Sequence, residues 1–389
     1  MSIVIFGDLF TFPEGNAATN RVYTYAKGFI ENGINVYIIC FTNDYFDKKE
    51  GNINGINYFH PFEPKKRSRY FIVRRWQKLL KYRNTYSLIK RINKGDKITA
   101  INCWSNLMDT HLFAKFLSRL CIAKLIVECN EHPLRYYKNS AVRKVKGKIK
   151  FFIESRIADG VLCISHYLIN FYKSRGISER KLLLVPSTVD PHRFSQPLSK
   201  PVQYPYIGYF GGLTFYRDNV DLLIKAFDQF SKPNSNAHLI LGGIGTDEER
   251  KQIEDLIREL NLQSKVQLLD YLSREDILHY IVNANILVMV RKNNFYTEVS
   301  YPSKLTEFLA SSKPVISVNV GEIPLYLKDS SDVFLVEPEN IEALAQKLDF
   351  VWNNYDLAIE VGRKGKQLTE TIFNYKYQAE RIISFINSN

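Results

Sequence analysis

The sequence predicts an α/β protein with two doubly wound domains, each built on a parallel sheet and facing the other across a cleft. Three observations support this prediction. The chain has 389 residues, more than twice the length of a typical domain. Short apolar runs alternate with amphipathic stretches in both halves, a pattern typical of repeated βα units. Between the halves lies a polar segment with three prolines, which fit neither a helix interior nor a central strand.

Apolar runs mark the expected strands in order along the chain. In the first half they span residues 2–7, 35–41, 98–103, 123–128, 160–164 and 181–185. In the second half they span about residues 205–211, 237–242, 266–269, 285–290, 314–318 and 332–335, each followed by a helical pattern. We therefore expect one domain over 1–190, a link over 191–204 and a second domain over 205–370. A ligand is expected at the carboxyl ends of the strands.

Composition excludes several classes of protein. Hydrophobic residues make up 45% and charged residues 24%, which is typical of a globular rather than a disordered chain. There is no run of about 18 apolar residues, and the first strand begins at once, without the regions of a signal peptide. The five cysteines form no C-x-x-C pair, which indicates buried free thiols in a reducing compartment. We therefore expect a cytoplasmic protein.

Positive charge is concentrated in the first half of a chain whose net charge is +13. Residues 64–94 contain twelve Lys and Arg and no acidic residue, and residues 135–150 contain seven and again no acid. Such local charge points to a polyanionic partner: lipid headgroups, a pyrophosphate or a nucleic acid.

Both basic stretches contain apolar residues at helical spacing. They are Ile72, Val73, Trp76, Leu79 and Leu80, and then Val142, Val145, Ile149, Phe152 and Ile153. The second set is flanked by Lys144, Lys146, Lys148 and Lys150. An apolar stripe with a cationic flank suits adsorption to an anionic membrane. Alternatively, the stripes pack on the sheet and the lysines are solvated. A nucleic-acid partner is a third interpretation, although no nucleic-acid-binding motif accompanies the aromatic residues.

Three strand-to-helix turns carry residues suited to anion binding. In residues 12–21, small residues precede a helix that runs to about Glu31, and Arg21 lies about one turn inside it. Residues 208–218 end a strand in a glycine pair and then supply Arg217, a pattern that could hold a diphosphate. Residues 239–245 form another glycine turn. An ordinary tight turn is the alternative for the first and third segments.

Residues 298–316 form the most informative stretch. Ser300 and Pro302 suit a helix start, so the amides of Ser303 and Lys304, with the lysine ammonium, could meet a phosphate. Glu307 follows one turn later and could accept hydrogen bonds from ribose hydroxyls. Alternatively, Glu307 pairs with Lys304 at i+3.

Taken together, these stretches resemble the family-four retaining glycosyltransferases of the GT-B fold. The matching segments are the turn with Asn20 and Arg21, residues 186–190, the Gly211 turn with Arg217, residues 242–245, 269–271 and 303–314, and the tail 373–381. Their order and spacing are specific together. The resemblance implies two Rossmann-like domains, the first for the acceptor and the second for a nucleotide sugar. It also implies a closing helix over 371–389 that crosses back to the first domain.

The resemblance implies a role for individual residues of the second half. Glu307 matches a glutamate that binds the donor ribose, and Arg217 matches a lysine that holds the diphosphate. The other residues that it places in the donor site are Ser303, Lys304, Tyr271, Gly212 and Gly243.

The resemblance also implies acceptor and catalytic residues. Gly15, Asn16 and Arg21 fall where the family's amino-terminal loop meets the acceptor. His132, with Glu131 beside it, corresponds to a polar residue next to the sugar.

Two positions depart from the family pattern. Val299 stands where a glutamate is expected, so Glu298 is the nearest candidate for that carboxylate, either through a one-residue bulge or with the sugar held differently. Gly212 replaces the usual arginine of the diphosphate pair.

The implied activity is metal-independent hexosyl transfer from a nucleotide diphosphate sugar, with no cofactor and no metal site. In such a site, helix amides and cations neutralise the departing phosphate. The implied acceptor is lipid-linked or a cell-envelope polysaccharide, at the inner face of the cell membrane. A nucleotide-sugar epimerase on the same fold, or a basic module that binds nucleic acid or lipid, are the alternatives.

Overall fold

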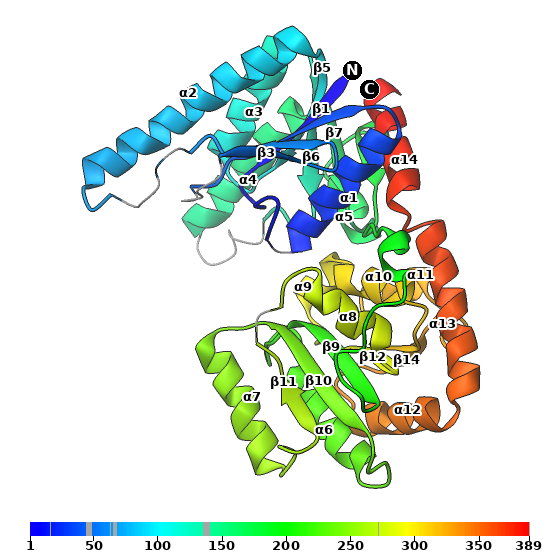
Figure 1. Cartoon of the computed structure of the whole chain (residues 1–389). Coiled ribbons are helices and arrows are strands. Elements are labelled where there is room, and N and C mark those ends of the chain that lie inside the picture. Colours follow the sequence, from blue (N-terminus) through cyan, green and yellow to red (C-terminus); the bar gives the residue numbers. More distant parts are fainter. Residues whose placement is uncertain are drawn as a thin grey trace. The chain divides into compact units, whose positions relative to one another are not determined.

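A computed structural model gives the structure of the chain and describes residues 1–15, 17–43, 49–62, 64, 68–134, 141–270 and 272–388 (Figure 1). The chain divides into two compact units. The first unit contains Met1–Thr188 and Tyr375–Asn389, and the second contains Val189–Asn374. Residues 191–204, expected as a link, fall in the second unit, where Pro191–Phe194 form the 3-10 helix η3.

The first unit contains an eight-stranded sheet in the order β3-β4-β2-β1-β5-β6-β7-β8 among its described residues. The strands are β1 (Ser2–Gly7), β2 (Asn35–Cys40), β3 (Glu50–Ile53), β4 (Ile56–Phe59), β5 (Ile98–Trp104), β6 (Lys124–Cys129), β7 (Gly160–Cys163) and β8 (Leu182–Leu184). All neighbours are parallel except the β3–β4 hairpin. Because these neighbours are parallel, the carboxyl ends of their strands share one edge.

The helices of the first unit are α1 (Ala17–Glu31), α2 (Phe71–Gly95), α3 (Met108–Cys121), α4 (Ala141–Ile157), α5 (His166–Lys173), α14 (Tyr375–Ser388) and the 3-10 helix η2 (Glu179–Lys181). The last helix packs along α1 and closes the core over β1 and β2. The Tyr375 hydroxyl donates to the Glu31 carboxylate at 2.7 Å. The carboxyl-terminal segment is therefore part of the first unit.

The second unit contains a parallel six-stranded sheet in the order β11-β10-β9-β12-β13-β14. Its strands are β9 (Tyr206–Gly212), β10 (His238–Ile244), β11 (Val266–Leu268), β12 (Ile286–Met289), β13 (Val315–Val318) and β14 (Phe334–Val336). Its helices are α6 (Val220–Ser231), α7 (Asp247–Glu259), α8 (Asp276–Asn283), α9 (Phe295–Val299), α10 (Ser303–Ala310), α11 (Ile323–Tyr326), α12 (Ile341–Asn353) and α13 (Tyr355–Glu370). The strand order reverses between β9 and β12, which is the place where such sheets bind ligands.

The predicted fold class is confirmed, and every predicted strand lies within two residues of an observed one. The hairpin of β3 and β4 was not predicted. Asn54 and Gly55 connect its strands with φ of 52° and 84°, and Asn-Gly is a frequent hairpin turn because both residues adopt positive φ easily. The five cysteines are buried and free, as their pattern predicted. In the described part of the chain, no helix combines the length and apolar character needed to cross a membrane.

Candidate functional site

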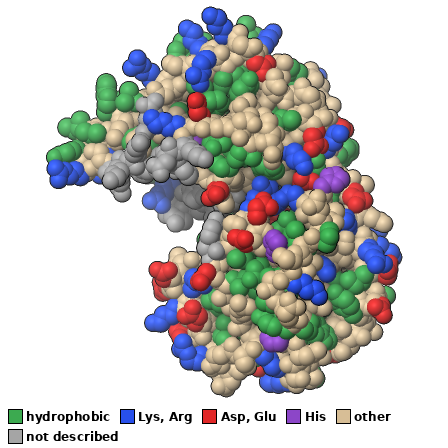
Figure 2. Space-filling view, viewed as in Figure 1, with side chains coloured by type: hydrophobic (Ala, Val, Ile, Leu, Met, Phe, Trp, Pro, Cys, Tyr) green, Lys and Arg blue, Asp and Glu red, His purple; other side chains and the backbone are tan. Residues whose placement is uncertain are grey.

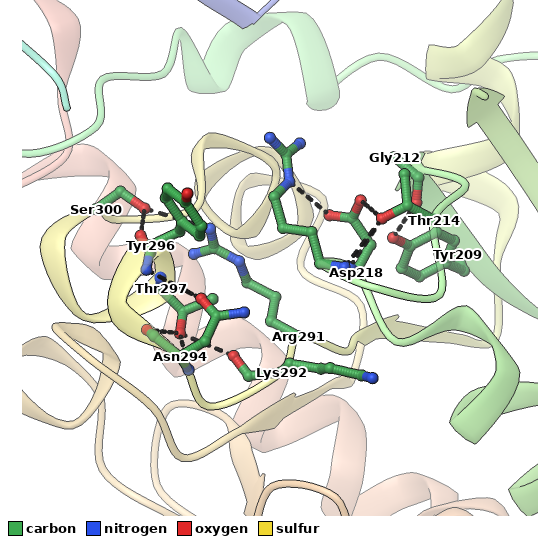
Figure 3. A network of polar contacts seen from close by, with 11 residues as sticks. Tyr209, Gly212, Thr214, Asp218, Arg291, Lys292, Asn294, Tyr296, Thr297 and Ser300 are labelled. Carbon is green, nitrogen blue, oxygen red and sulfur yellow. Dashed lines mark hydrogen bonds and ion pairs between the residues drawn. The ribbon is translucent and has the colours of Figure 1, made fainter. Parts of the chain in front are cut away.

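Two neighbouring loops at the carboxyl edge of the second sheet form a polar network (Figure 3). One follows β9 and carries Arg217 and Asp218, and the other follows β12 and carries Arg291 and Lys292. The Arg217 Nε lies 3.5 Å from the Asp218 Oδ1, and the Thr214 hydroxyl donates to Asp218 Oδ2 at 2.7 Å. The backbone N–H of Lys292 donates to the Arg217 carbonyl at 3.2 Å. The two loops are therefore joined directly.

Close packing explains two glycines that the sequence placed in the donor site. A Cβ on Gly212 would lie 2.3 Å from an oxygen of the Asp218 carboxylate, so no side chain fits while Asp218 keeps its place. Gly243 has φ of 152°, and its Cβ would lie 1.7 Å from the carbonyl oxygen of Gly211. The arginine that the resemblance expects at position 212 is therefore excluded by the Asp218 carboxylate.

The two guanidinium groups of the network differ in their surroundings. The side chain of Arg217 is 52% exposed, so its charge is accessible to a ligand. Arg291 is half-buried with its Nη1 shielded from solvent, and its Nη2 donates to the Ser300 hydroxyl at 3.3 Å. Burial lowers the pKa of Arg291 to about 10, Asp218 partly offsets this, and Arg217 lowers the pKa further. The charged form of Arg291 is therefore destabilised in the ligand-free protein.

Helix α10 begins with the backbone amides that the sequence predicts for phosphate binding. Its N-cap residue is Pro302, which supplies no side-chain hydrogen bond to the first amides. The Lys304 ammonium lies 3.2 Å from Glu307 Oε2, so the structure shows the i+3 pair that was the structural alternative for Glu307. The side chain of Lys304 is 25% exposed and that of Glu307 is 12% exposed. Because i,i+3 ion pairs on a helix contribute little stability, this pair does not by itself exclude a ligand contact by either group.

Helix α9 carries both Val299, at the position where the resemblance expects a glutamate, and Glu298, the nearest candidate for that carboxylate. The Asn294 side chain accepts hydrogen bonds from the amides of Tyr296 and Thr297 and so fixes the start of the helix. Val299 is 3% exposed and packs in the core, whereas the neighbouring Glu298 is exposed. The position that the family pattern assigns to a glutamate is therefore an apolar core position here.

Arg21 has a structural environment, in contrast to the acceptor-binding role expected for it. It is 5% exposed, and its Nε lies 3.0 Å from the buried Glu128 carboxylate. Its Nη1 and Nη2 each donate at 2.7 Å to the carbonyls of Pro186 and Val185. All three nitrogens thus bind protein oxygens, and the side chain ties α1 to β6 and to the segment after β8. We correct the expectation accordingly: this guanidinium does not face a ligand.

The remaining expected residues of the first unit lie near the carboxyl ends of its strands. Gly15 precedes α1, and a Cβ there would meet the hydroxyls of Thr19 and Thr11 at 2.2 and 2.5 Å. His132 Nδ1 accepts from the Leu134 amide at 3.1 Å, and its ring packs edge-on against Phe171 with centroids 4.4 Å apart. The hydrogen bond and the ring contact together fix the orientation of His132.

Of the three remaining expected residues, the structure describes one. Glu131 follows β6 and is exposed. Asn16 and Tyr271 lie outside the described residues.

Helices α2 and α4 present a surface that is both apolar and basic. We define the α2/α4 surface by its exposed apolar residues, which are Phe71, Ile72, Val73, Trp76, Leu79, Val142, Val145, Ile149 and Phe152. Exposed basic residues lie among them, namely Arg75, Lys78, Lys144, Lys146 and Lys148. The beginning of α2 extends away from the rest of its unit in Figure 1, and Figure 2 shows apolar and basic side chains there. The exposure of these residues contradicts the interpretation that they pack on the sheet, whereas Leu80 and Ile153 of the same stripes are half-buried.

Lys150 is the exception among the lysines of α4. It is 4% exposed, and its ammonium lies 2.6 Å from the buried Glu154 carboxylate, which also bonds to His111 Nδ1. Glu154 therefore joins α4 to His111 of α3, and Lys150 pairs with this carboxylate within α4 and does not belong to the exposed surface. Its burial could not be read from the sequence, since it has the same spacing as its exposed neighbours.

Sequence analysis missed two residues of the network after β9 and β12. Asp218 directly follows the predicted cation Arg217, and Arg291 directly follows the strand predicted at 285–290. A charged residue at the carboxyl end of a central parallel strand was the signal that could have identified Arg291.

Comparison with known proteins gives consistent results for both halves. Residues 18–193 match the family described as Glycosyltransferase Family 4, and residues 192–368 match the family described as Glycosyl transferases group 1. An uncharacterized glycosyltransferase from Methanocaldococcus jannaschii is 24% identical over 300 residues, which is 77% of each chain.

Similar solved structures cover the whole chain. One is sucrose-phosphate synthase from Thermosynechococcus elongatus, with a TM-score of 0.73 and 17% identity over 100% of this chain and 98% of that one. Another is Anabaena HepE in complex with UDP, with a TM-score of 0.70 and 13% identity over 100% of both chains. At these identities the likeness shows a shared fold.

Proposed function

The chain belongs to the family-four-like glycosyltransferases of the GT-B fold, and from this premise we propose that it transfers a hexose from a nucleoside diphosphate donor with retention of configuration. One observation supports the donor site most strongly. The β9 loop with Arg217 and the β12 loop that leads to α10 are hydrogen-bonded at the carboxyl edge of one sheet. Cations and helix amides thereby lie on adjacent elements, as a diphosphate requires.

The proposed chemistry assigns roles to these groups. Departure of the sugar leaves negative charge on the β-phosphate, and groups already in place stabilise that charge most effectively. Arg217 and Lys304 supply cations, the first amides of α10 supply donors, and Glu307 accepts from the ribose hydroxyls. In this proposal no metal ion takes part. Glu131, His132 and Glu298 remain proposals for groups near the transferred sugar.

Uridine diphosphate is the first nucleotide to test, because crystal structures of the similar HepE contain UDP, UDP with glucose, and UDP-glucose. The function is tested by incubating the protein with UDP-glucose, GDP-mannose or ADP-glucose and following the products by proton NMR. We expect release of a nucleoside diphosphate and a product whose anomeric configuration matches that of the donor. Isomerised donor without any transfer would instead favour the epimerase.

Glu307→Gln tests the ribose contact. We expect donor affinity to fall by about 1–3 kcal/mol, because a charge-assisted hydrogen bond is lost. The melting temperature of the ligand-free protein should stay nearly constant, since an i,i+3 pair such as Lys304–Glu307 contributes only about 0.2–0.5 kcal/mol. Isothermal titration calorimetry with UDP measures the first effect and calorimetric melting the second. Unchanged affinity for UDP would show that Glu307 does not bind the ribose.

We also propose that the α2/α4 surface adsorbs to the anionic inner face of the cell membrane. This location suits a lipid-linked or cell-envelope polysaccharide acceptor. Large exposed apolar side chains gain free energy by entering the interface between headgroups and acyl chains. Each basic residue near an anionic surface adds about 1 kcal/mol. The exposed positions of the apolar residues are the observation that favours this partner over a solvated helix face.

The variant with Lys144, Lys146 and Lys148 all changed to glutamine tests the membrane proposal. Three lost cations should weaken binding to phosphatidylcholine vesicles containing phosphatidylglycerol by about tenfold to a hundredfold at low salt. Co-sedimentation measures this binding. The matched control changes Lys225, Lys251 and Lys364 of the second unit to glutamine and should bind as the parent does. Binding that responds neither to the α4 variant nor to salt would contradict the proposal.

A further inference from the structure

Arg291 is a cation for which the described part of the protein supplies no carboxylate partner. Its Nη1 is shielded from solvent and has no hydrogen-bond partner among the described residues. Its Nη2 has a hydroxyl partner, Ser300, rather than a carboxylate. The nearby carboxylate of Asp218 pairs with Arg217 and accepts a hydrogen bond from Thr214. A shielded guanidinium N–H without an acceptor is costly, so its presence calls for an anion that is supplied by a ligand.

The position of Arg291 indicates which ligand supplies that anion. The residue after it, Lys292, is hydrogen-bonded through its backbone to Arg217. Figure 3 shows Arg291 between Asp218 on one side and Tyr296 and Ser300 on the other. Its side chain thus contacts the segment that leads into α10, while the backbone of the next residue is bonded to the β9 loop. Both of those elements belong to the proposed diphosphate site.

We propose that Arg291 is the second guanidinium of the diphosphate seat, binding phosphate oxygens through Nη1 together with Arg217. This inference rests on the proposed function and adds a residue to it. The Asp218 carboxylate pairs with Arg217, so the positive charge of Arg291 is left for a diphosphate to neutralise. Gly212 cannot carry a cation because Asp218 occupies the adjoining space. The second cation therefore comes from the neighbouring strand.

The electrostatics of the ligand-free protein agree with this assignment. Burial and the charge of Arg217 both lower the pKa of Arg291, and Asp218 offsets them only in part. A bound anion would stabilise the charged form of Arg291. Consequently, the loss of Arg291 should weaken anion binding without lowering the stability of the ligand-free protein, whereas a purely structural arginine would show the opposite behaviour.

Inorganic pyrophosphate is the probe for this inference, because it contains the diphosphate without a base or a sugar. Isothermal titration calorimetry is performed on the parent protein and on Arg291→Gln, Arg291→Lys and Arg217→Gln. We expect Arg291→Gln to bind pyrophosphate at least about tenfold more weakly, and Arg291→Lys to recover part of the loss. Ligand-free Arg291→Gln should melt at the parent temperature or above it.

Lys225→Gln is the matched control, since it removes one positive charge from the surface of α6 in the same unit, where Lys225 pairs with Asp221. It should bind within about twofold of the parent. Parent-like binding by Arg291→Gln, with loss of binding in Arg217→Gln, would overturn this inference and leave the proposed function standing. A lower melting temperature of ligand-free Arg291→Gln would also overturn it. A parent protein that binds neither pyrophosphate nor UDP, GDP or ADP would contradict both.

Discussion

Arg217→Gln is expected to lower kcat/KM for the donor by about 10²–10³-fold, the usual effect of removing one group that stabilises charge in a transition state. Arg217 lies at the carboxyl edge of the second sheet beside the Asp218 carboxylate, and its side chain is 52% exposed. Its charge is therefore accessible to the diphosphate. The loss should fall mainly on kcat, because negative charge on the departing diphosphate is greatest in the transition state. Steady-state kinetics with the active nucleotide sugar measure it.

Lys225→Gln provides the control for Arg217→Gln. Lys225 lies on α6 of the same unit and pairs with Asp221 on the helix surface. Its removal should leave kcat/KM within about twofold, because exposed i,i+4 pairs contribute little. Parent-like turnover by Arg217→Gln would show that the diphosphate is held elsewhere.

Arg21→Met is expected to destabilise the first unit by about 3–5 kcal/mol, because it leaves the Glu128 carboxylate buried without its cation. Differential scanning calorimetry should show an earlier transition for this unit. Arg83→Met is the control, since Arg83 is exposed and its loss should change stability by no more than about 0.5 kcal/mol. An unchanged transition in Arg21→Met would contradict the structural role of this residue.

The destabilisation by Arg21→Met should also depend on pH. Burial raises the pKa of Glu128 above its ordinary value of 4.5, and Arg21 partly offsets this rise. Without Arg21 the folded-state pKa rises further, so the folded protein binds a proton that the unfolded chain has released. The stability that this proton gives to the folded variant is then lost as pH increases from 4.5 through the folded-state pKa of Glu128. The difference between parent and variant should therefore be larger at pH 8 than at pH 5, and Glu128→Gln in the variant should abolish that dependence.

Local sequence pattern was sufficient for most of the fold. Apolar runs bounded by turn residues located the strands, because a strand buried on both faces is apolar throughout. The hairpin of β3 and β4 lacked such a run, since its strands are short and partly exposed, and only the turn at Asn54 and Gly55 indicated it. Its detection required turn chemistry rather than hydropathy.

The candidate site was only partly predictable from the sequence. Arg217 could be proposed because it follows a strand and a glycine pair. Lys304 and Glu307 could be proposed because they follow Ser300 and Pro302, which suit a helix start. The partner of a charge, in contrast, is set by tertiary packing. Arg21 was expected to meet the acceptor, yet it is buried against the Glu128 carboxylate of β6. Lys150 was expected among the solvated lysines, yet it is buried against Glu154, which is itself held by His111 of another helix. Arg291 gains its significance from the loop that follows β9, which is more than seventy residues away in sequence.

The proposed diphosphate site of the second unit is tested most directly by measuring how much the β-phosphate contributes to nucleotide binding. Isothermal titration calorimetry compares UDP, GDP and ADP with their monophosphates, in the parent protein and in Arg217→Gln. We predict that one nucleoside diphosphate binds the parent at least about tenfold more tightly than its monophosphate, and that Arg217→Gln loses most of this difference. Equal affinities for diphosphate and monophosphate in the parent, or a difference that persists in Arg217→Gln, would contradict this site.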